Sequence, residues 1–228
     1  MSVQQWSDYS HIFGNERLKA VFSHSSFCSN SGQDRQHFAR ITGLDPSKLI
    51  IPQQTHSANV SVVGKAGGVK NSDAIFSTNT NLVCSIQVAD CLPLFFVHGS
   101  KPITGLVHAG WRGLARGIIR NIKNELDQIA CNIFDFNILI GPSIHSCCFE
   151  VRDDVLGQID SEFYRQKDYG SYEVDLQNWA VKQLLEIGGQ KEKITIIREC
   201  TYCQDGKFHS YRRNGKKAGR MIALIGWG

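Results

Sequence analysis

The chain has 228 residues and eight cysteines, and its formal net charge is +4 at pH 7. This length can bury one sizeable core, so we expect a single domain over residues 1–228. No stretch approaches the roughly 18 consecutive apolar residues of a membrane span, and the mild charge argues against broad nucleic-acid binding. The first residues lack the basic-then-apolar pattern of a secretory signal. We therefore expect a cytoplasmic protein with reduced thiols and no membrane partner.

Short apolar runs in the first part of the chain predict strands and one helix. They lie at residues 18–22, 33–42 (the helix), 49–51 and 59–63. The last two strands are joined by a hinge, 52–57, which contains Gln54 and His56. His56 is therefore expected on a connection, outside any helix or strand.

The middle of the chain carries the densest set of reactive side chains. Strands are predicted at 82–88 and 92–97, and the tripeptide between them, 89–91, ends in Asp90 and Cys91. A third apolar run ends in His108, and the Gly-rich segment after it is typical of a strand-to-helix turn. Strand ends followed by such loops are where α/β proteins gather reactive groups.

The second half of the chain mixes helices and strands without a steady alternation. Apolar residues recur at helical spacing over 114–129, and Asp175 is a candidate N-cap for another helix that ends at Gly188. Further strands and one short helix are predicted at 136–140, 147–151, 153–159 (the helix), 194–197 and 221–225. This order favours an α+β domain with mixed β-sheet layers flanked by helices. The chain has neither a Gly-x-Gly-x-x-Gly fingerprint nor a P-loop, which removes the commonest nucleotide-cofactor sites.

Three side chains at strand edges, His56, Cys91 and His108, form a donor set that zinc accepts. Catalytic zinc commonly takes three protein ligands and leaves a fourth position open, and two histidines with one cysteine is a known set. The three residues are separated by 35 and 17 positions, so no local motif brings them together. From the residues alone, two interpretations stay open: the three side chains bind one metal ion, or each of them has a structural role.

Four other cysteines occur as two pairs. Cys147 and Cys148 are adjacent and near His145, which leaves a second metal site open, although a partly buried structural pair is the favoured interpretation. Cys200 and Cys203 have the spacing of a zinc knuckle or a redox pair, but the sequence offers no second pair of this kind to complete a tetrahedral site. We interpret both pairs as structural.

A set of short motifs extends from Gln54 to the end of the chain. They are Gln54-Thr55-His56, Asp73-Ala74-Ile75, Ala89-Asp90-Cys91-Leu92-Pro93, His108-Ala109-Gly110-Trp111-Arg112-Gly113, Ile140-Gly141-Pro142-Ser143-Ile144, Cys148-Phe149-Glu150-Val151, Cys200-Thr201-Tyr202-Cys203, His209-Ser210-Tyr211-Arg212-Arg213 and Gly219-Arg220. Together they resemble the YfiH family of laccase-domain proteins, also called polyphenol-oxidase proteins. The resemblance implies a YfiH-like fold and a zinc ion, or alternatively copper, held by His56, Cys91 and His108.

The resemblance also implies an enzyme that acts on purine nucleosides and phosphate. The implied reactions are phosphorolysis of adenosine, inosine and S-methyl-5'-thioadenosine, and deamination of adenosine; one open zinc position suits both. We expect Arg112 to hold phosphate oxygens, and Asp90 either to move a proton or to orient a ligand histidine. Cys91 and His108 complete the expected catalytic set. The residues expected to contact substrate are Gln54, Trp111, Arg212, Arg213 and Arg220.

Two other reaction classes stay open. In a metal-free cysteine hydrolase, Cys91 is the nucleophile, His108 the base, and Asp90 or another group orients that base; the substrate is then an amide or a peptidoglycan precursor. The third class is a copper-dependent phenol oxidase, since two histidines and a cysteine suit one copper ion. A trinuclear copper cluster needs many more histidines, usually in His-x-His pairs, and this chain has no such pair. The sequence does not determine the oligomeric state.

One segment departs from the pattern of the family. Many members carry Arg-x-Gly-Gly-Val-Ser near the N-terminus, whereas this chain has Ser-His-Ser-Ser-Phe-Cys-Ser at 23–29. We expect the wall of the pocket that this loop contributes to differ, with an effect on substrate preference.

Overall fold

A computed structural model describes residues 4–27 and 34–228. Part of the divergent N-terminal loop, and the first residue of the helix expected at 33–42, lie outside the described residues. The described helices are α1 Asp34–Ile41, α2 Trp111–Ala115, α3 Ile118–Gln128, α4 Asp153–Leu156, α5 Leu176–Glu186 and α6 Tyr211–Asn214. The described strands are β1 Trp6–Asp8, β2 Leu18–Ser23, β3 Leu49–Pro52, β4 Val60–Val62, β5 Gly67–Val69, β6 Ala74–Ser77, β7 Val83–Val88, β8 Leu92–His98, β9 Thr104–Ala109, β10 Phe136–Ile140, β11 Glu150–Val151, β12 Tyr164–Asp168, β13 Ser171–Val174, β14 Ile194–Ile196 and β15 Met221–Trp227.

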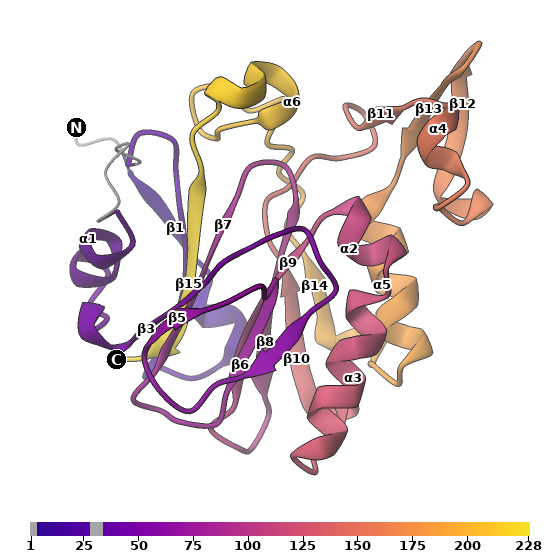
Figure 1. Ribbon diagram of the computed structural model, residues 1–228. Coiled ribbons are helices and arrows are strands. Elements are labelled where there is room, and N and C mark those ends of the chain that lie inside the picture. Colours follow the sequence, from indigo (N-terminus) through magenta and orange to yellow (C-terminus); the bar gives the residue numbers. More distant parts are fainter. Residues whose placement is uncertain (1–3, 28–33) are drawn as a thin grey trace.

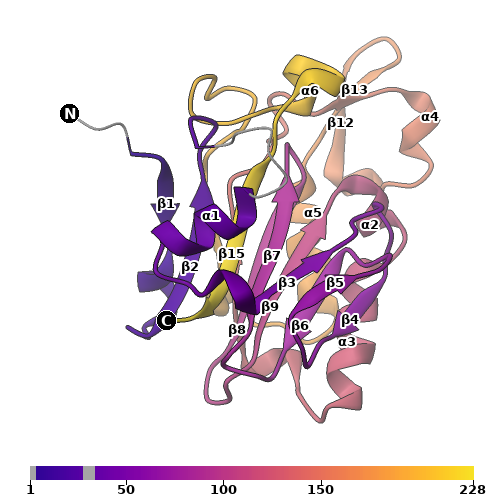
Figure 2. The ribbon, with the colours of Figure 1, turned by 60° about the vertical axis from the view of Figure 1, so that its left-hand side comes forward.

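Two mixed sheets form the centre of the molecule. Within the described ranges, one six-stranded sheet has the order β1-β2-β15-β7-β3-β5, and the other has the order β14-β10-β8-β9-β6-β4. Most neighbours are antiparallel, but β3 runs parallel to both β5 and β7, β10 runs parallel to β14, and β4 runs parallel to β6. Helix α1 covers the outer face of the first sheet, whereas α2, α3 and α5 cover the outer face of the second (Figures 1 and 2). The predicted α+β class with mixed sheet layers flanked by helices is confirmed.

The alternation of side chains along β8 explains this layering. Phe95 packs between the two sheets with Ile86 of β7, while its neighbour Phe96 packs on the opposite face beneath helix α3. On β7, Val83 points the other way, toward Phe38 of α1. Central strands are thus buried on both faces, which is why they appear in the sequence as continuous apolar runs.

Strand ends bring the reactive residues of the middle segment to one edge. Strands β8 and β9 are antiparallel, and their register pairs Pro93 with His108 and Leu92 with Ala109. Cys91 immediately precedes β8, so this register sets it beside the residues that follow β9. Helix α2 then begins after Gly110, which has extended backbone angles at the N-cap.

The structure differs from the predicted elements in particular places. The single helix expected at 114–129 is divided into α2 and α3, because Gly117 between them adopts a left-handed φ of 80°. Five short strands were not predicted: β1, β5, β6, β12 and β13. The N-cap prediction for Asp175 is confirmed, since its side chain accepts a hydrogen bond of 3.0 Å from the backbone N–H of Asn178.

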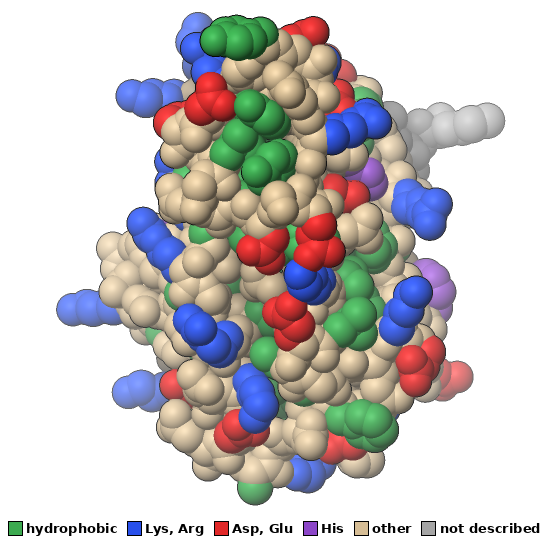
Figure 3. All heavy atoms as spheres, turned by 90° about the vertical axis from the view of Figure 1, so that its right-hand side faces the viewer, with side chains coloured by type: hydrophobic (Ala, Val, Ile, Leu, Met, Phe, Trp, Pro, Cys, Tyr) green, Lys and Arg blue, Asp and Glu red, His purple; other side chains and the backbone are tan. Residues whose placement is uncertain are grey.

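The surface over α3 and α5 carries charges of both signs, with hydrophobic side chains between them (Figure 3). Acidic and basic side chains are intermixed on this face (Figure 3), and Lys182 contacts the carboxylate of Glu162 there. None of the described helices combines the length and the apolar composition that crossing a bilayer requires.

Candidate metal centre and its pocket

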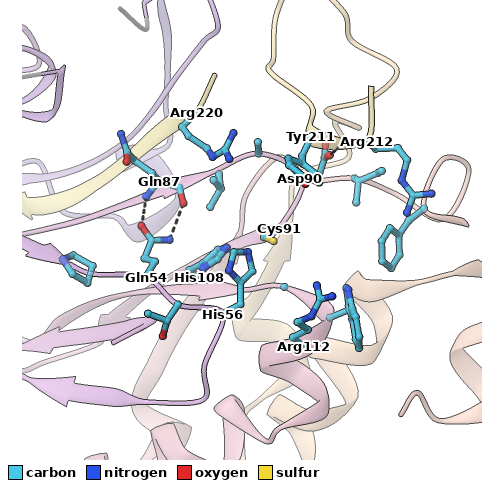
Figure 4. A pocket seen from close by; sticks show the side chains of 18 of the residues that line it. Gln54, His56, Gln87, Asp90, Cys91, His108, Arg112, Tyr211, Arg212 and Arg220 are labelled. Atoms are coloured by element: carbon cyan, nitrogen blue, oxygen red, sulfur yellow. Dashed lines mark hydrogen bonds between the residues drawn. The ribbon is translucent and has the colours of Figure 1, made fainter. Parts of the chain in front are cut away.

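A pocket of about 980 Å³ opens at the edge of the sheets where β7 ends and α2 begins. Its floor contains the three residues predicted as metal ligands, His56, Cys91 and His108, which meet near the centre of Figure 4. One donor atom from each lies within 4.8 Å of the other two, and the two imidazole ring centres are 4.7 Å apart. These distances are short enough for one ion to contact all three donors, so the donor set fits the metal that the sequence predicts.

Gly110 makes room for the sulfur atom. A Cβ atom at this position would lie 2.7 Å from Cys91 Sγ and 3.8 Å from Cδ2 of His56. The first distance is far inside van der Waals contact, so any side chain here would push the thiol out of place. The φ of Gly110 is −80°, an ordinary value, and the requirement for glycine is therefore steric.

Asp73 holds two of the three donors, and sequence reasoning did not select it as a site residue. Its Oδ1 accepts a hydrogen bond of 2.8 Å from Nδ1 of His108 and another of 3.1 Å from the backbone N–H of His56. Its Oδ2 accepts bonds of 2.7 Å from both the backbone N–H and the hydroxyl of Ser57. Because Nδ1 of His108 is engaged, its Nε2 is left for the metal or for Cys91. The signal that the sequence offered for Asp73 was its position directly before an apolar run.

The backbone of the His56 loop is strained, and the same carboxylate supports it. His56 has a left-handed φ of 57°, which costs on the order of 1–3 kcal/mol for a residue with a side chain. Asp73 binds three successive backbone N–H groups of this loop, from Thr55 to Ser57, and the Arg116 guanidinium donates to the carbonyl of His56 at 3.0 Å. These bonds fix the direction of the imidazole.

Charges in this group are strongly coupled. Burial raises the pKa of the Cys91 thiol, but the adjacent His108 and His56 outweigh burial and bring it down to about 6. Burial lowers the pKa of His108, but the Cys91 sulfur and the Asp73 carboxylate together raise it to about 9. Burial also acts to raise the pKa of Asp73, but hydrogen bonds from His108 and Ser57 hold it well below its usual range. In the metal-free protein, Cys91 is therefore a thiolate beside an imidazolium at neutral pH.

Asp90 has a different place from the one expected for an orienting residue. The side chain of Asp73, and not that of Asp90, contacts the imidazole of His108, so the expectation that Asp90 orients this histidine is corrected. Oδ1 of Asp90 accepts from the hydroxyl of Thr201 at 2.6 Å, and its Oδ2 accepts from the hydroxyl of Ser210 and the backbone N–H of Arg212. Asp90 thus ties the segment before the Cys91 thiol to the C-terminal loop.

Arginines and aromatic rings alternate around the rim of the pocket. Arg112 lies 4.3 Å from the ring centre of Trp111, and Arg212 lies 5.3 Å from that of Phe149. Arg220 extends toward the pocket from the residue before β15 (Figure 4). The predicted substrate-binding residues that line the pocket are Gln54, Trp111, Arg212 and Arg220, and the predicted catalytic Arg112 lines it as well.

Arg213 is missing from the described residues that line this pocket. Its guanidinium donates hydrogen bonds to the carbonyl oxygens of Thr201, Tyr202 and Phe208, at 2.6 to 3.1 Å. It also forms an ion pair with Asp205. The expectation that Arg213 contacts substrate is corrected accordingly: its donors hold the C-terminal loop together.

A hydrogen-bonded group at the end of the pocket away from Arg112 was not predicted from the sequence. The side-chain amide of Gln54 donates to the backbone carbonyl of Gln87 and accepts from its N–H, both at 2.8 Å (Figure 4). Gln54 thereby continues the pairing of β3 with β7 past the end of the strand. Arg35 of α1 reaches the same place and donates to the Ser85 hydroxyl at 3.0 Å. Burial lowers the pKa of Arg35 to about 10, so it keeps its positive charge at neutral pH.

A second group of potential metal ligands lies outside the site formed by His56, Cys91 and His108. It consists of four sulfur atoms within 4.8 Å of one another, here called the four-cysteine cluster: Cys147, Cys148, Cys200 and Cys203. The expectation that no second pair completes a four-ligand set with Cys200 and Cys203 was wrong, because the fold brings Cys147 and Cys148 beside them. The structural role of both pairs stays a prediction. The seven cysteines of the described chain are all free thiols, as expected.

Comparison with known proteins places these features in a family. Residues 29–228 match the family model described as multi-copper polyphenol oxidoreductase laccase. Purine nucleoside phosphorylase YlmD of Geobacillus stearothermophilus is 30% identical over 213 residues, covering 85% of this chain and 77% of that protein. Purine nucleoside phosphorylase YfiH of Escherichia coli is 31% identical over 188 residues, covering 79% and 74%. Adenosine deaminase RL5, from an unknown prokaryotic organism, is 27% identical and covers 98% and 95%.

Solved structures agree with this match at the level of the fold. YlmD from Geobacillus stearothermophilus has a TM-score of 0.90 at 24% identity, over 100% of this chain and 97% of that one. The Bacillus licheniformis hypothetical protein YfiH has a TM-score of 0.86, also at 24% identity, over 92% and 93%. The family model alone matches most of the chain, and two named relatives reach 30% identity. The chain therefore belongs to the YfiH/YlmD family of laccase-domain proteins.

Proposed function

We propose that this protein is a zinc-dependent purine nucleoside phosphorylase that also deaminates adenosine. Its proposed substrates are adenosine, inosine and S-methyl-5'-thioadenosine. The observation that carries the proposal is the convergence of His56, Cys91 and His108 on the floor of a pocket whose rim is rich in arginine. The names of the relatives, purine nucleoside phosphorylase and adenosine deaminase, support the same substrate class.

The three donors are suited to zinc, with Asp73 behind them. Zinc bound there would supply Lewis-acid chemistry at an open coordination position. The Asp73 carboxylate holds His108 in the tautomer that offers Nε2, and it fixes the strained loop that carries His56. Such outer hydrogen bonds orient metal ligands and raise their basicity. Copper is the alternative ion for the same three donors.

The arginines fit the second substrate of a phosphorolysis. In that reaction a phosphate oxygen bonds to C1' of the ribose as the bond from C1' to the purine nitrogen breaks. The electron pair leaves with the base, which then takes a proton. Arg112 and Arg212 both line the pocket and can donate to phosphate oxygens, although one nitrogen of Arg212 donates to the backbone carbonyl of Glu150 at 2.6 Å. Arg35 adds a buried positive charge at the far end of the pocket.

The aromatic side chains fit the purine. Trp111, Phe149 and Tyr211 all line the pocket, and flat apolar surfaces of this kind stack on nucleobases. In deamination, water adds to C6 of the purine and ammonia leaves. The two reactions differ in the co-substrate and in the carbon attacked, C1' of the ribose for phosphate and C6 of the purine for water, and stacking of the base on these rings serves both.

Product analysis tests the proposal. Zinc-loaded protein is incubated with adenosine, with and without inorganic phosphate, and the products are separated and identified. Adenine and ribose 1-phosphate formed only in the presence of phosphate are the expected products of phosphorolysis, and inosine is the expected product of deamination. Absence of all these products in zinc-loaded, folded protein would contradict the proposal.

A second candidate is a metal-free cysteine hydrolase that acts on an amide or a peptidoglycan precursor. It is favoured by one observation: Cys91, His108 and Asp73 have the order of a nucleophile, a base and an orienting carboxylate. His56→Ala separates the candidates. The zinc enzyme loses bound metal and activity in this variant, whereas the hydrolase keeps its nucleophile, base and carboxylate and remains active.

A further inference from the structure

The four-cysteine cluster lies outside the residues proposed to act on nucleosides. Four of its sulfur-to-sulfur distances are 3.3, 3.5, 3.8 and 3.9 Å. A tetrahedral zinc ion with bonds of about 2.3 Å to sulfur separates its ligands by about 3.8 Å. A disulfide instead needs about 2.05 Å between two sulfurs, and the described cysteines are all free. The spacing therefore corresponds to a shared tetrahedral ion.

Two tight turns present these thiols to one another. In the first, the N–H groups of Cys148 and Phe149 both donate to the carbonyl of His145, each at 2.9 Å. In the second, the N–H of Gln204 donates to the carbonyl of Cys200 at 3.1 Å. Each turn aims two cysteines toward the same point, so the cluster is formed by backbone geometry that does not depend on the sulfurs themselves.

The two turns are also fixed relative to each other. Ser143 and Cys200 form a parallel β-bridge, in which the N–H of Thr201 donates to the Ser143 carbonyl at 3.0 Å. The buried hydroxyl of Ser143 in turn accepts from the Gln177 side chain of α5 at 2.8 Å. The backbone N–H of His145 points at the sulfur of Cys200, with N to S 3.5 Å. N–H groups directed at sulfur are the usual outer partners of a metal-bound thiolate.

We propose that the four-cysteine cluster is a second zinc site, with a structural role. It is a closed site, with four thiolate ligands and no position for substrate, unlike the three-ligand centre. Two of its thiols, Cys147 and Cys203, are exposed, so an ion has a path of entry.

The proposed ion stabilises one wall of the nucleoside pocket. Cys148 is followed by Phe149, which lines that pocket, and Cys200 is followed by Thr201, whose hydroxyl holds Asp90 at 2.6 Å. Zinc at the four-cysteine cluster thus joins the loop after β10 to the loop that anchors the segment beside Cys91. This inference does not depend on the reaction catalysed in the pocket.

Metal content measured by mass spectrometry tests the proposal. The full-length protein is purified under reducing conditions with zinc and washed with a mild chelator. We expect two zinc ions per chain in the wild type and one in His56→Ala, in Cys147→Ser and in Cys203→Ser. Cys131→Ala, which removes a buried thiol outside both sites, is the matched control and keeps two. Unchanged zinc in Cys203→Ser, or none in His56→Ala, would overturn the proposal.

Cobalt spectroscopy tests the proposed metal site without a substitution in the four-cysteine cluster. His56→Ala protein loaded with cobalt(II) is expected to show the intense visible bands of a tetrahedral ion and the near-ultraviolet charge-transfer absorption of four thiolates. These bands are expected to weaken sharply in His56→Ala/Cys203→Ser. Octahedral bands without thiolate charge transfer, or a disulfide within the cluster detected by alkylation and peptide mapping of the purified protein, would contradict a zinc site.

Discussion

Asp73 accepts a hydrogen bond of 2.8 Å from Nδ1 of His108, and both side chains are buried. The same oxygen accepts the backbone N–H of His56, so one carboxylate orients two of the three donors from behind. The arrangement of the site therefore depends on a residue that is not among those lining the pocket.

Replacing Asp73 by Asn is expected to weaken zinc binding. The amide group preserves size but loses the charge, and its NH₂ end cannot accept from His108. Loss of such an outer partner lowers metal affinity about 10- to 100-fold. Competition with a chelator measures this affinity. Asp90→Asn is the control, because Asp90 bonds to the C-terminal loop and to neither histidine; equal losses in both variants would contradict the role given to Asp73.

Gly110→Ala is expected to displace the Cys91 thiol. The added Cβ would lie 2.7 Å from the sulfur, while the backbone angles at this position suit alanine. A ligand moved by an ångström lowers activity about 100-fold. Phosphorolysis rate and zinc content are measured together with the melting temperature. Gly64→Ala is the control, since a Cβ there meets no atom within 4 Å; unchanged zinc binding in Gly110→Ala would contradict the crowding argued here.

In metal-free protein, Cys91 is expected to react with iodoacetamide at neutral pH. Burial opposes ionisation, but the two histidines lower the thiol pKa to about 6 from the ordinary value of 9.0. The alkylation rate, followed for the Cys91 peptide by mass spectrometry, is therefore expected to reach half its maximum near pH 6. Removal of one histidine in His56→Ala is expected to raise that midpoint. A midpoint near 9 in the wild-type protein would show that the histidines do not stabilise the thiolate.

The free energy of unfolding is expected to decrease as the pH drops below the ordinary pKa of histidine, in part because His98 is buried in its neutral form. Burial lowers the pKa of this side chain, and its Nδ1 accepts the backbone N–H groups of Ser100 and Lys101. Because the folded state resists protonation, unfolding takes up a proton once the pH is below the unfolded pKa of 6.5. His98 therefore contributes stability above that pH and loses it below.

His98→Asn tests this assignment, since Oδ1 of Asn is an acceptor at the place of Nδ1 and does not titrate. The melting temperature is measured from about pH 7.5 to about pH 5.5, one unit on either side of the ordinary histidine pKa of about 6.5. The decline is expected to be shallower in the variant. An identical decline would assign it to other groups, such as His24, whose pKa is also lowered by burial.

Most of the layered fold was predictable from the sequence because its central strands are buried on both faces. The run 92–97 is apolar throughout and the run 136–140 is apolar except for Asn137, and the structure has strands at both places. Two of the strands that were not predicted have little apolar content: β5 is Gly67-Gly68-Val69 and β12 is Tyr-Arg-Gln-Lys-Asp. Strand β6, Ala74–Ser77, is apolar and buried, but it is only four residues long. Their pairing is set by neighbouring strands, which local sequence does not report.

Only the residues of the site whose own side chains are typical metal donors could be predicted from the sequence. His56, Cys91 and His108 were selected as donors, and the structure brings them together. Asp73 was missed because its role follows from contacts across 17 and 35 positions of the chain. The four-cysteine cluster was missed for the same reason: its two pairs are more than 50 positions apart, and contacts such as the bridge between Ser143 and Cys200 bring them together.

The most direct test of the proposed zinc centre at His56, Cys91 and His108 is anomalous diffraction at the zinc absorption edge, from crystals of protein loaded with zinc. We expect a peak bonded to Sγ of Cys91 at about 2.3 Å and to one nitrogen each of His56 and His108 at about 2.0–2.1 Å, with one coordination position facing the pocket. Crystals in which these donors hold no peak, while the four-cysteine cluster does, would contradict a zinc-dependent active site.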